Sequence, residues 1–113
     1  MTASLFGLDL RRLFDALAAS EGAPGNPLGV PRERLADLGR AYGCRFSPAA
    51  LADRRSSENL VLAFWDFFGS RYERSARKPP TAGVLARMLR FGPSGWKSDE
   101  AAGWWRRVGA GLE

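Results

Sequence analysis

The sequence predicts an all-α protein with five to six helices in one domain. Apolar residues recur at spacings of three and four along most of the chain, which is the helical period. The 13 Gly and 7 Pro gather largely between these stretches, as expected of sharp connections. No stretch alternates clearly enough to predict a strand, although a short hairpin near residues 24–30 stays open. A chain of 113 residues supports one core of this kind, so we expect a single domain over residues 1–113.

The first helix is predicted over residues 5–20, with Ser4 as its cap. Its apolar stripe consists of Phe6, Leu10, Leu13, Phe14 and Leu17. Residues 21–30 then hold five Gly or Pro, which excludes both helix and strand there. A loop of this length is unusual in a small helical domain, and such loops often carry function.

Two shorter helices are predicted next. The first begins at Pro31, since proline suits the first helical position, and ends at Gly43. Its stripe consists of Leu35, Leu38 and Tyr42. Ser47 and Pro48 open the second, which reaches about Asp53 with Ser47 as its cap.

A long helix over residues 57–75, capped by Ser57, is predicted to be the centre of the fold. Between residues 60 and 68 it is apolar on nearly every side, as in a buried helix. We expect the other helices to pack around its central part, near residues 58–74. Asp66 interrupts the apolar run, and it needs a partner such as Arg71 unless it lies at an exposed edge.

Two helices complete the prediction. Thr81 caps the first, whose core face is Val84, Leu85, Met88 and Leu89. A Gly-Pro-Ser-Gly turn over residues 92–95 ends it, and Ser98 or Asp99 begins the last helix. Adjacent residues point about 100° apart on a helix, so we expect at most one of Trp104 and Trp105 to face the core fully.

Cysteine and histidine counts narrow the possible chemistry. The chain has one cysteine, Cys44, and no histidine. A disulfide framework, a metal centre built on these residues and histidine acid–base catalysis are therefore excluded. We expect neither a metal nor a cofactor, and any catalysis must use carboxylates, hydroxyls or arginines.

The positive charge is concentrated in the second part of the chain. Residues 70–113 hold nine Lys or Arg and four acids, which accounts for the whole net charge of +5. This suits an anionic partner, or else forms a solvated basic face. Nucleic acid ranks last among such partners, because no helix-turn-helix signature is present. No stretch reaches the length of a membrane span and no signal peptide is visible, and we expect a monomer.

Two sequence blocks suggest a family. Residues 19–29 read Ala-Ser-Glu-Gly-Ala-Pro-Gly-Asn-Pro-Leu-Gly after a helix, and residues 90–96 read Arg-Phe-Gly-Pro-Ser-Gly-Trp before a Trp-Trp helix. Together with their spacing, these blocks resemble the lysozyme-like domains of the soluble lytic transglycosylase type. The resemblance covers about residues 13–108 and implies a lysozyme-like fold.

The resemblance also implies an activity and a site. Glu21 matches the family's general acid, and the implied activity is cleavage of bacterial peptidoglycan with that single carboxyl group. The implied substrate-binding residues are Arg90, Phe91, Gly92, Pro93 and Trp105. An active wall hydrolase of this type would work outside the cytoplasm or with a phage.

The chain departs from the family where sugars would be held. A Gln expected after residue 29 is missing, the cleft Asn-Gly-Gly reads Arg90-Phe91-Gly92, and the Tyr of a Tyr-Trp pair is Trp104. Without these Asn and Gln side chains, the chain lacks amide groups that would orient a sugar. Two functions therefore stay open: a peptidoglycan-cleaving enzyme, and an inactive lysozyme-like domain that binds wall glycan or a protein.

Overall fold

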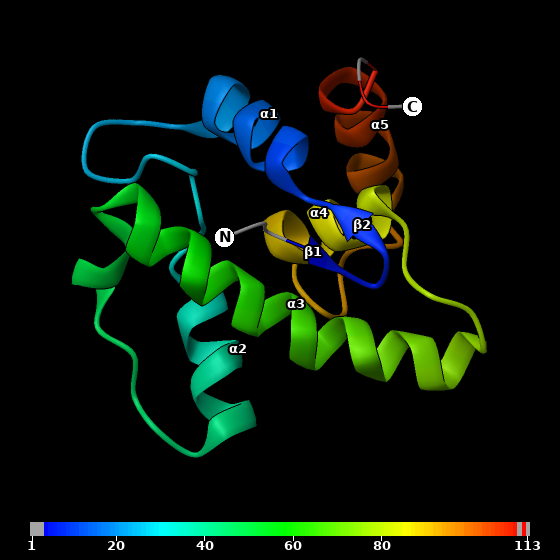
Figure 1. Cartoon of the computed structure of the whole chain (residues 1–113), viewed down its shortest axis with the longest axis horizontal. Coiled ribbons are helices and arrows are strands. Elements are labelled where there is room, and N and C mark those ends of the chain that lie inside the picture. Colours follow the sequence, from blue (N-terminus) through cyan, green and yellow to red (C-terminus); the bar gives the residue numbers. More distant parts are fainter. Residues whose placement is uncertain (1–3, 111, 113) are drawn as a thin grey trace.

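The longest helix, α3 (Arg54–Ala76), crosses the molecule and carries a large part of the core (Figure 1). The computed structural model describes residues 4–110 and 112. The buried positions of α3 recur every three or four residues: Ser57, Leu60, Val61, Phe64, Trp65, Phe68 and Gly69. Helices α2 (Glu33–Tyr42) and α4 (Ala82–Phe91) and the 3-10 turn η1 (Pro48–Leu51) pack against it. The predicted central helix is confirmed.

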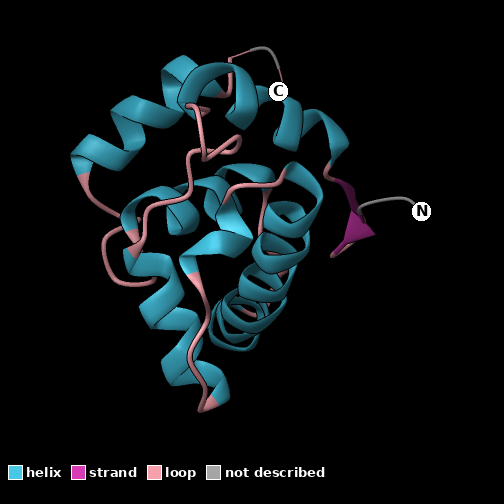
Figure 2. Cartoon of the chain, turned by 90° about the vertical axis from the view of Figure 1, so that its left-hand side faces the viewer, coloured by secondary structure: helices cyan, strands magenta, loops and turns pink. Residues whose placement is uncertain are grey.

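The described part of the chain is mostly helical, as predicted (Figure 2). Helix α5 (Asp99–Val108) packs on α4, and α1 (Arg11–Glu21) packs on α5. The first helix of the chain therefore meets the last one, which places residues some 80 positions apart side by side. None of the described helices is long and apolar enough to span a membrane.

The prediction of helix is wrong for the N-terminal part of the first predicted helix. A short hairpin precedes α1. Its strands, β1 (Ser4–Leu5) and β2 (Leu8–Asp9), have two residues each. Phe6 and Gly7 form its turn with φ of 54° and 77°, a left-handed conformation that a helix does not allow. The turn places the Phe6 ring against Gly69 of α3, where a Cβ atom would lie 2.6 Å from it. Tertiary packing therefore overrides the helical stripe here.

Helix ends follow the predicted caps except at α1 and α3: the predicted cap Ser4 lies in β1, and α1 begins after Leu10 without a side-chain cap. The side chains of Ser47, Thr81 and Ser98 accept hydrogen bonds from the first turns that they precede. Helix α3 is capped instead by Asp53, which accepts from the Ser56 N–H at 2.9 Å. The predicted cap Ser57 is buried inside the first turn. An aspartate four residues earlier was the better cap, because it completes one more helical turn.

Three expectations about single side chains also have outcomes. Asp66 is exposed, so the edge position is the correct alternative. Tyr42 is 49% exposed and lies outside the core. Trp104 and Trp105 are only 5% and 9% exposed, so the expectation that at most one of them faces the core fully is wrong. Both are buried because α5 packs between α1 and α4.

Candidate functional site

Helix α1 places Glu21 at its last position. Leu13, Phe14 and Leu17 bury one face of the helix in the core and fix its direction. The helix stops at Gly22, which adopts an extended conformation and donates its N–H to the Ala18 carbonyl at 3.1 Å. The carboxyl group of Glu21 therefore starts from a fixed backbone at the end of the helix.

The loop after α1 folds back onto Glu21. Gly29 has a φ of +64°, and a Cβ atom at this position would lie 2.2 Å from the Glu21 carbonyl oxygen. Only glycine can approach so closely. Gly22 is enclosed in the same way, since a Cβ atom there would lie 2.4 Å from the carbonyl oxygens of both Ala18 and Pro27. The glycines of this loop thus hold the helix end tightly.

Asn26 locks the shape of the loop. Its side chain donates to the Val30 carbonyl at 2.9 Å and accepts from the Val30 N–H at 3.0 Å. Its backbone forms an isolated antiparallel bridge with Ala23 around the turn that contains Gly25. The hairpin left open for residues 24–30 is therefore a single tight turn at residues 23–26, and the long loop is an ordered support for Glu21.

The Glu21 carboxylate is held by two side chains from distant parts of the sequence. The Trp104 indole N–H of α5 donates to Oε1 at 2.6 Å. The Arg90 Nε of α4 lies 3.3 Å from the same oxygen. The Glu21 side chain is 18% exposed, whereas that of Arg90 is 43% exposed. One carboxylate oxygen therefore ties together three helices, α1, α4 and α5.

A groove of about 670 Å³ opens beside this cluster. Its lining includes Ala19, Ser20, Glu21, Arg90, Trp104 and Arg107, and we call it the Glu21 groove. The small side chains of α1 keep it open on one side. Two arginines and one glutamate leave its lining with an excess of positive charge, which suits a ligand with acidic groups.

The predicted substrate-binding residues do not all meet in this groove. Arg90 does line it, and Phe91 packs edge-on against the Trp104 ring at 5.6 Å. Gly92 lies elsewhere, against the buried guanidinium of Arg34, whose NH1 would be 2.4 Å from a Cβ atom. Pro93 lines a different pocket. The Gly-Pro turn therefore does not form a wall of the Glu21 groove.

Trp104, rather than Trp105, lines the groove. The Trp105 indole packs on Gly83, where a Cβ atom would lie 2.6 Å from its Nε1. Sequence reasoning missed Trp104 and Arg107 as site residues. The three-residue spacing between them was a usable signal, because it places both on one face of α5.

Asp37 and Asp53, the two other carboxylates that the sequence offers as partners of Glu21, do not reach the groove. Asp37 pairs with Arg34 and Arg40 within α2. Asp53 is engaged as the cap of α3, and the hydrogen bond from the Ser56 N–H lowers its pKa. Glu21 is thus the single acidic residue in the groove lining.

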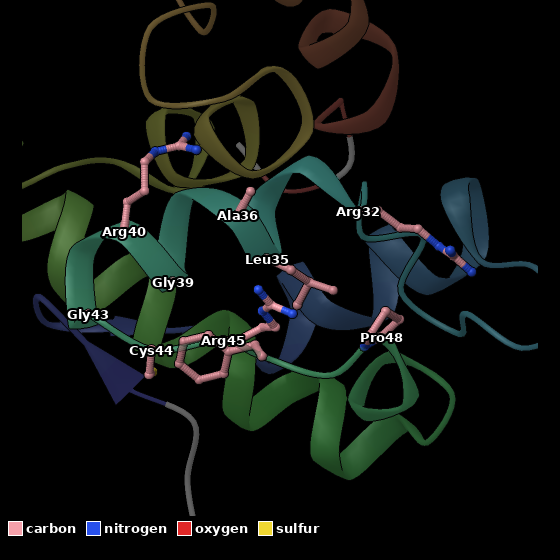
Figure 3. Close-up of a pocket in the computed structure, with 10 residues that line it drawn as sticks. Arg32, Leu35, Ala36, Gly39, Arg40, Gly43, Cys44, Arg45 and Pro48 are labelled. Atoms are coloured by element: carbon pink, nitrogen blue, oxygen red, sulfur yellow. The ribbon is translucent and has the colours of Figure 1, made fainter.

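The surface has further hollows, and two of them, of unequal volume, bear on ligand binding. The larger, about 720 Å³, runs along α2 and the segment after it, and we call it the α2 groove (Figure 3). Leu35, Phe46 and Pro48 contribute apolar surface, and Arg32, Arg40 and Arg45 contribute positive charge. The smaller, about 440 Å³, includes Trp96 and is called the Trp96 pocket. No group of three or more metal-ligating side chains occurs among the described residues.

Comparison of the chain with protein-family models, with curated proteins and with solved structures gave no match.

Proposed function

We propose that this chain is a lysozyme-like domain that binds the glycan of bacterial peptidoglycan in the Glu21 groove without cleaving it. The observation that carries the proposal is the double contact on Glu21, whose Oε1 meets both the Trp104 indole N–H and the Arg90 guanidinium. The groove keeps the position of a glycosidase acid, but its carboxylate serves as a structural acceptor.

The chemistry of glycoside cleavage supports the non-catalytic form. A general acid must deliver a proton to the oxygen of the leaving sugar, so that oxygen must lie beside the carboxyl group. In this chain, Trp104 and Arg90 already occupy the place beside Oε1. No second carboxylate lines the groove, so Glu21 would have to do all of the acid–base work while it is held by these two side chains.

The choice of glycan rests on the sequence resemblance together with the lining of the groove. The blocks at residues 19–29 and 90–96 keep the family's order, and both supply residues to this groove. Arg90 and Arg107 would contact the acidic groups that peptidoglycan carries on its sugars and peptides, and Ser20 offers a hydroxyl for hydrogen bonds.

Cosedimentation with purified, insoluble peptidoglycan tests the binding. The informative variant is Arg107→Ala, and its matched control is Arg106→Ala, the neighbouring exposed arginine of α5 that does not line the groove. Both variants lose the same charge. We expect Arg107→Ala to weaken binding several-fold more than Arg106→Ala does. Equal losses would point to unspecific charge attraction, and no sedimentation of the unchanged protein would leave a protein partner as the alternative.

Cleavage of the glycan by Glu21 is the second candidate, and the exposure of Arg90 favours it. An ion pair with a side chain that is 43% exposed contributes little and breaks easily, so an incoming sugar could displace Arg90. Release of soluble glycan fragments from purified walls decides between the two forms, because both hydrolysis and transglycosylation produce them. The non-catalytic form predicts no release by the unchanged protein at any pH. Release that Glu21→Gln abolishes would establish the enzyme instead.

A further inference from the structure

The Trp96 pocket has the features of a ligand site separate from the Glu21 groove. It lies between the second half of α3 and the turn that joins α4 to α5. Its volume of about 440 Å³ is in the range of small-molecule sites. The residues that matter for a ligand are Arg71, Tyr72, Ser75, Ser94, Trp96 and Lys97. None of them lines the Glu21 groove.

The Trp96 ring is held in place but stays partly accessible. The edge of Tyr72 meets it with the ring centres 5.7 Å apart. The Arg87 guanidinium and the Lys97 amino group lie 5.2 Å and 5.4 Å from the ring centre. Such contacts fix the orientation of an indole, which can then offer its apolar surface to the C–H groups of a sugar ring.

The positive charge in this pocket is not neutralised. No acidic residue lines it, and within residues 4–110 and 112 neither Arg71 nor Lys97 forms an ion pair. Arg71 instead lies over the rings of Phe67 and Phe68, with its guanidinium carbon 6.0 Å from each centre. Aromatic contacts leave the N–H groups of a guanidinium free to bind an anion.

Hydroxyl groups complete the pocket. Tyr72, Ser75 and Ser94 all contribute to its lining, and each hydroxyl can donate and accept a hydrogen bond. Two cations would bind an acidic group, the hydroxyls would bind sugar hydroxyls, and the indole would contact the ring. We propose that the Trp96 pocket binds an anionic saccharide, meaning a sugar or polyol that carries a phosphate or carboxylate group. This proposal does not depend on the function of the Glu21 groove.

Calorimetric titration tests the proposal with four probes: glucose 6-phosphate, glucuronic acid, glucose and inorganic phosphate. We expect the two acidic sugars to bind at least about ten-fold more tightly than glucose or inorganic phosphate, a difference of about 1.4 kcal/mol. The stronger of the two acidic sugars identifies the acidic group. Indole N–H resonances in a ¹H–¹⁵N spectrum locate the site, since the Trp96 signal should shift and the Trp104 signal should not.

Matched variants separate this site from general charge attraction. Arg71→Gln and Lys97→Gln remove the two cations, and both side chains are exposed, so the fold should be retained. Their controls are Arg74→Gln, on the same helix, and Lys78→Gln, the other lysine of the chain; neither lines the pocket. Each pocket variant should weaken binding about ten-fold, and each control less than about two-fold. Circular dichroism checks that all four variants stay folded.

Three results would overturn the proposal. The first is equal weakening by pocket and control variants. The second is equal affinity for glucose 6-phosphate, glucose and inorganic phosphate. The third is binding of a single-stranded oligonucleotide that exceeds that of both acidic sugars and depends on Arg71 and Lys97, which would assign the pocket to nucleic acid.

Discussion

At the scale of the residue, the position of Glu21 depends on a glycine of the opposing loop. Gly29→Ala would force a side chain into a left-handed backbone and against the Glu21 carbonyl, 2.2 Å away. We expect a loss of about 1–3 kcal/mol in the free energy of unfolding, measured by urea denaturation. Gly25→Ala is the control, because Gly25 also has a positive φ, of +78°, but has nothing within 4 Å of its Cβ position. Equal losses would show that the close approach is unimportant.

The contacts of Glu21 can be separated by two substitutions. Glu21→Gln keeps an oxygen for the Trp104 indole N–H but loses the charge beside Arg90. Because Arg90 is 43% exposed, we expect this variant to lose less than about 1 kcal/mol. Glu21→Ala leaves the N–H of a tryptophan that is only 5% exposed without its acceptor, and should cost about 1–3 kcal/mol. Thermal denaturation of the two variants side by side measures the difference, and similar losses would mean that Arg90 dominates.

At the scale of the element, the start of α3 makes part of the stability depend on pH. The Ser56 N–H bonds the ionised Asp53 and lowers its pKa below the ordinary value of 3.8. A pKa that is lower in the folded than in the unfolded chain gives stability that is present above about pH 4. That stability is lost as the pH falls through the folded value.

Asp53→Asn tests this cap, because asparagine accepts the same hydrogen bond without a charge. We expect the melting temperature of the variant to fall less between about pH 5 and pH 2 than that of the unchanged protein. Asp66→Asn, which changes an exposed aspartate of the same helix outside its cap, is the control and should follow the unchanged protein. Identical pH profiles for all three proteins would assign the acid sensitivity to other carboxylates.

The elements were more predictable than the site. Helix periods and caps such as Thr81 and Ser98 are local signals, and they located α4 and α5 closely. The hairpin before α1 was not predictable, because it depends on the Phe6 ring meeting Gly69, more than 60 residues away in the sequence. The predicted Glu21 and Arg90 do come together, but the contact of Glu21 with Trp104 joins residues 83 positions apart. Only the packing of α1 on α5 determines which of the two adjacent tryptophans contacts Glu21.

At the scale of the whole molecule, the uneven charge predicts a salt effect. Residues 70–113 hold the entire net charge of +5, and they supply cations to both the Glu21 groove and the Trp96 pocket. Electrostatic attraction is screened over about 10 Å in 0.1 M salt and about 3 Å in 1 M salt. Sedimentation with peptidoglycan should therefore weaken markedly between these two concentrations. Binding that is unchanged by salt would show that apolar contacts dominate.

The α2 groove has a consequence for handling the protein. Cys44, the single cysteine of the chain, is exposed and lines this groove. Without an internal partner, its thiol can be oxidised to a disulfide only with another molecule. Air oxidation should therefore give a covalent pair of chains joined through their α2 sides, visible on a non-reducing gel and removed by dithiothreitol. Such a linkage would bring the α2 grooves of the two copies together, and the Glu21 groove and the Trp96 pocket, which share no lining residue with the α2 groove, would then be present twice in one bivalent reagent.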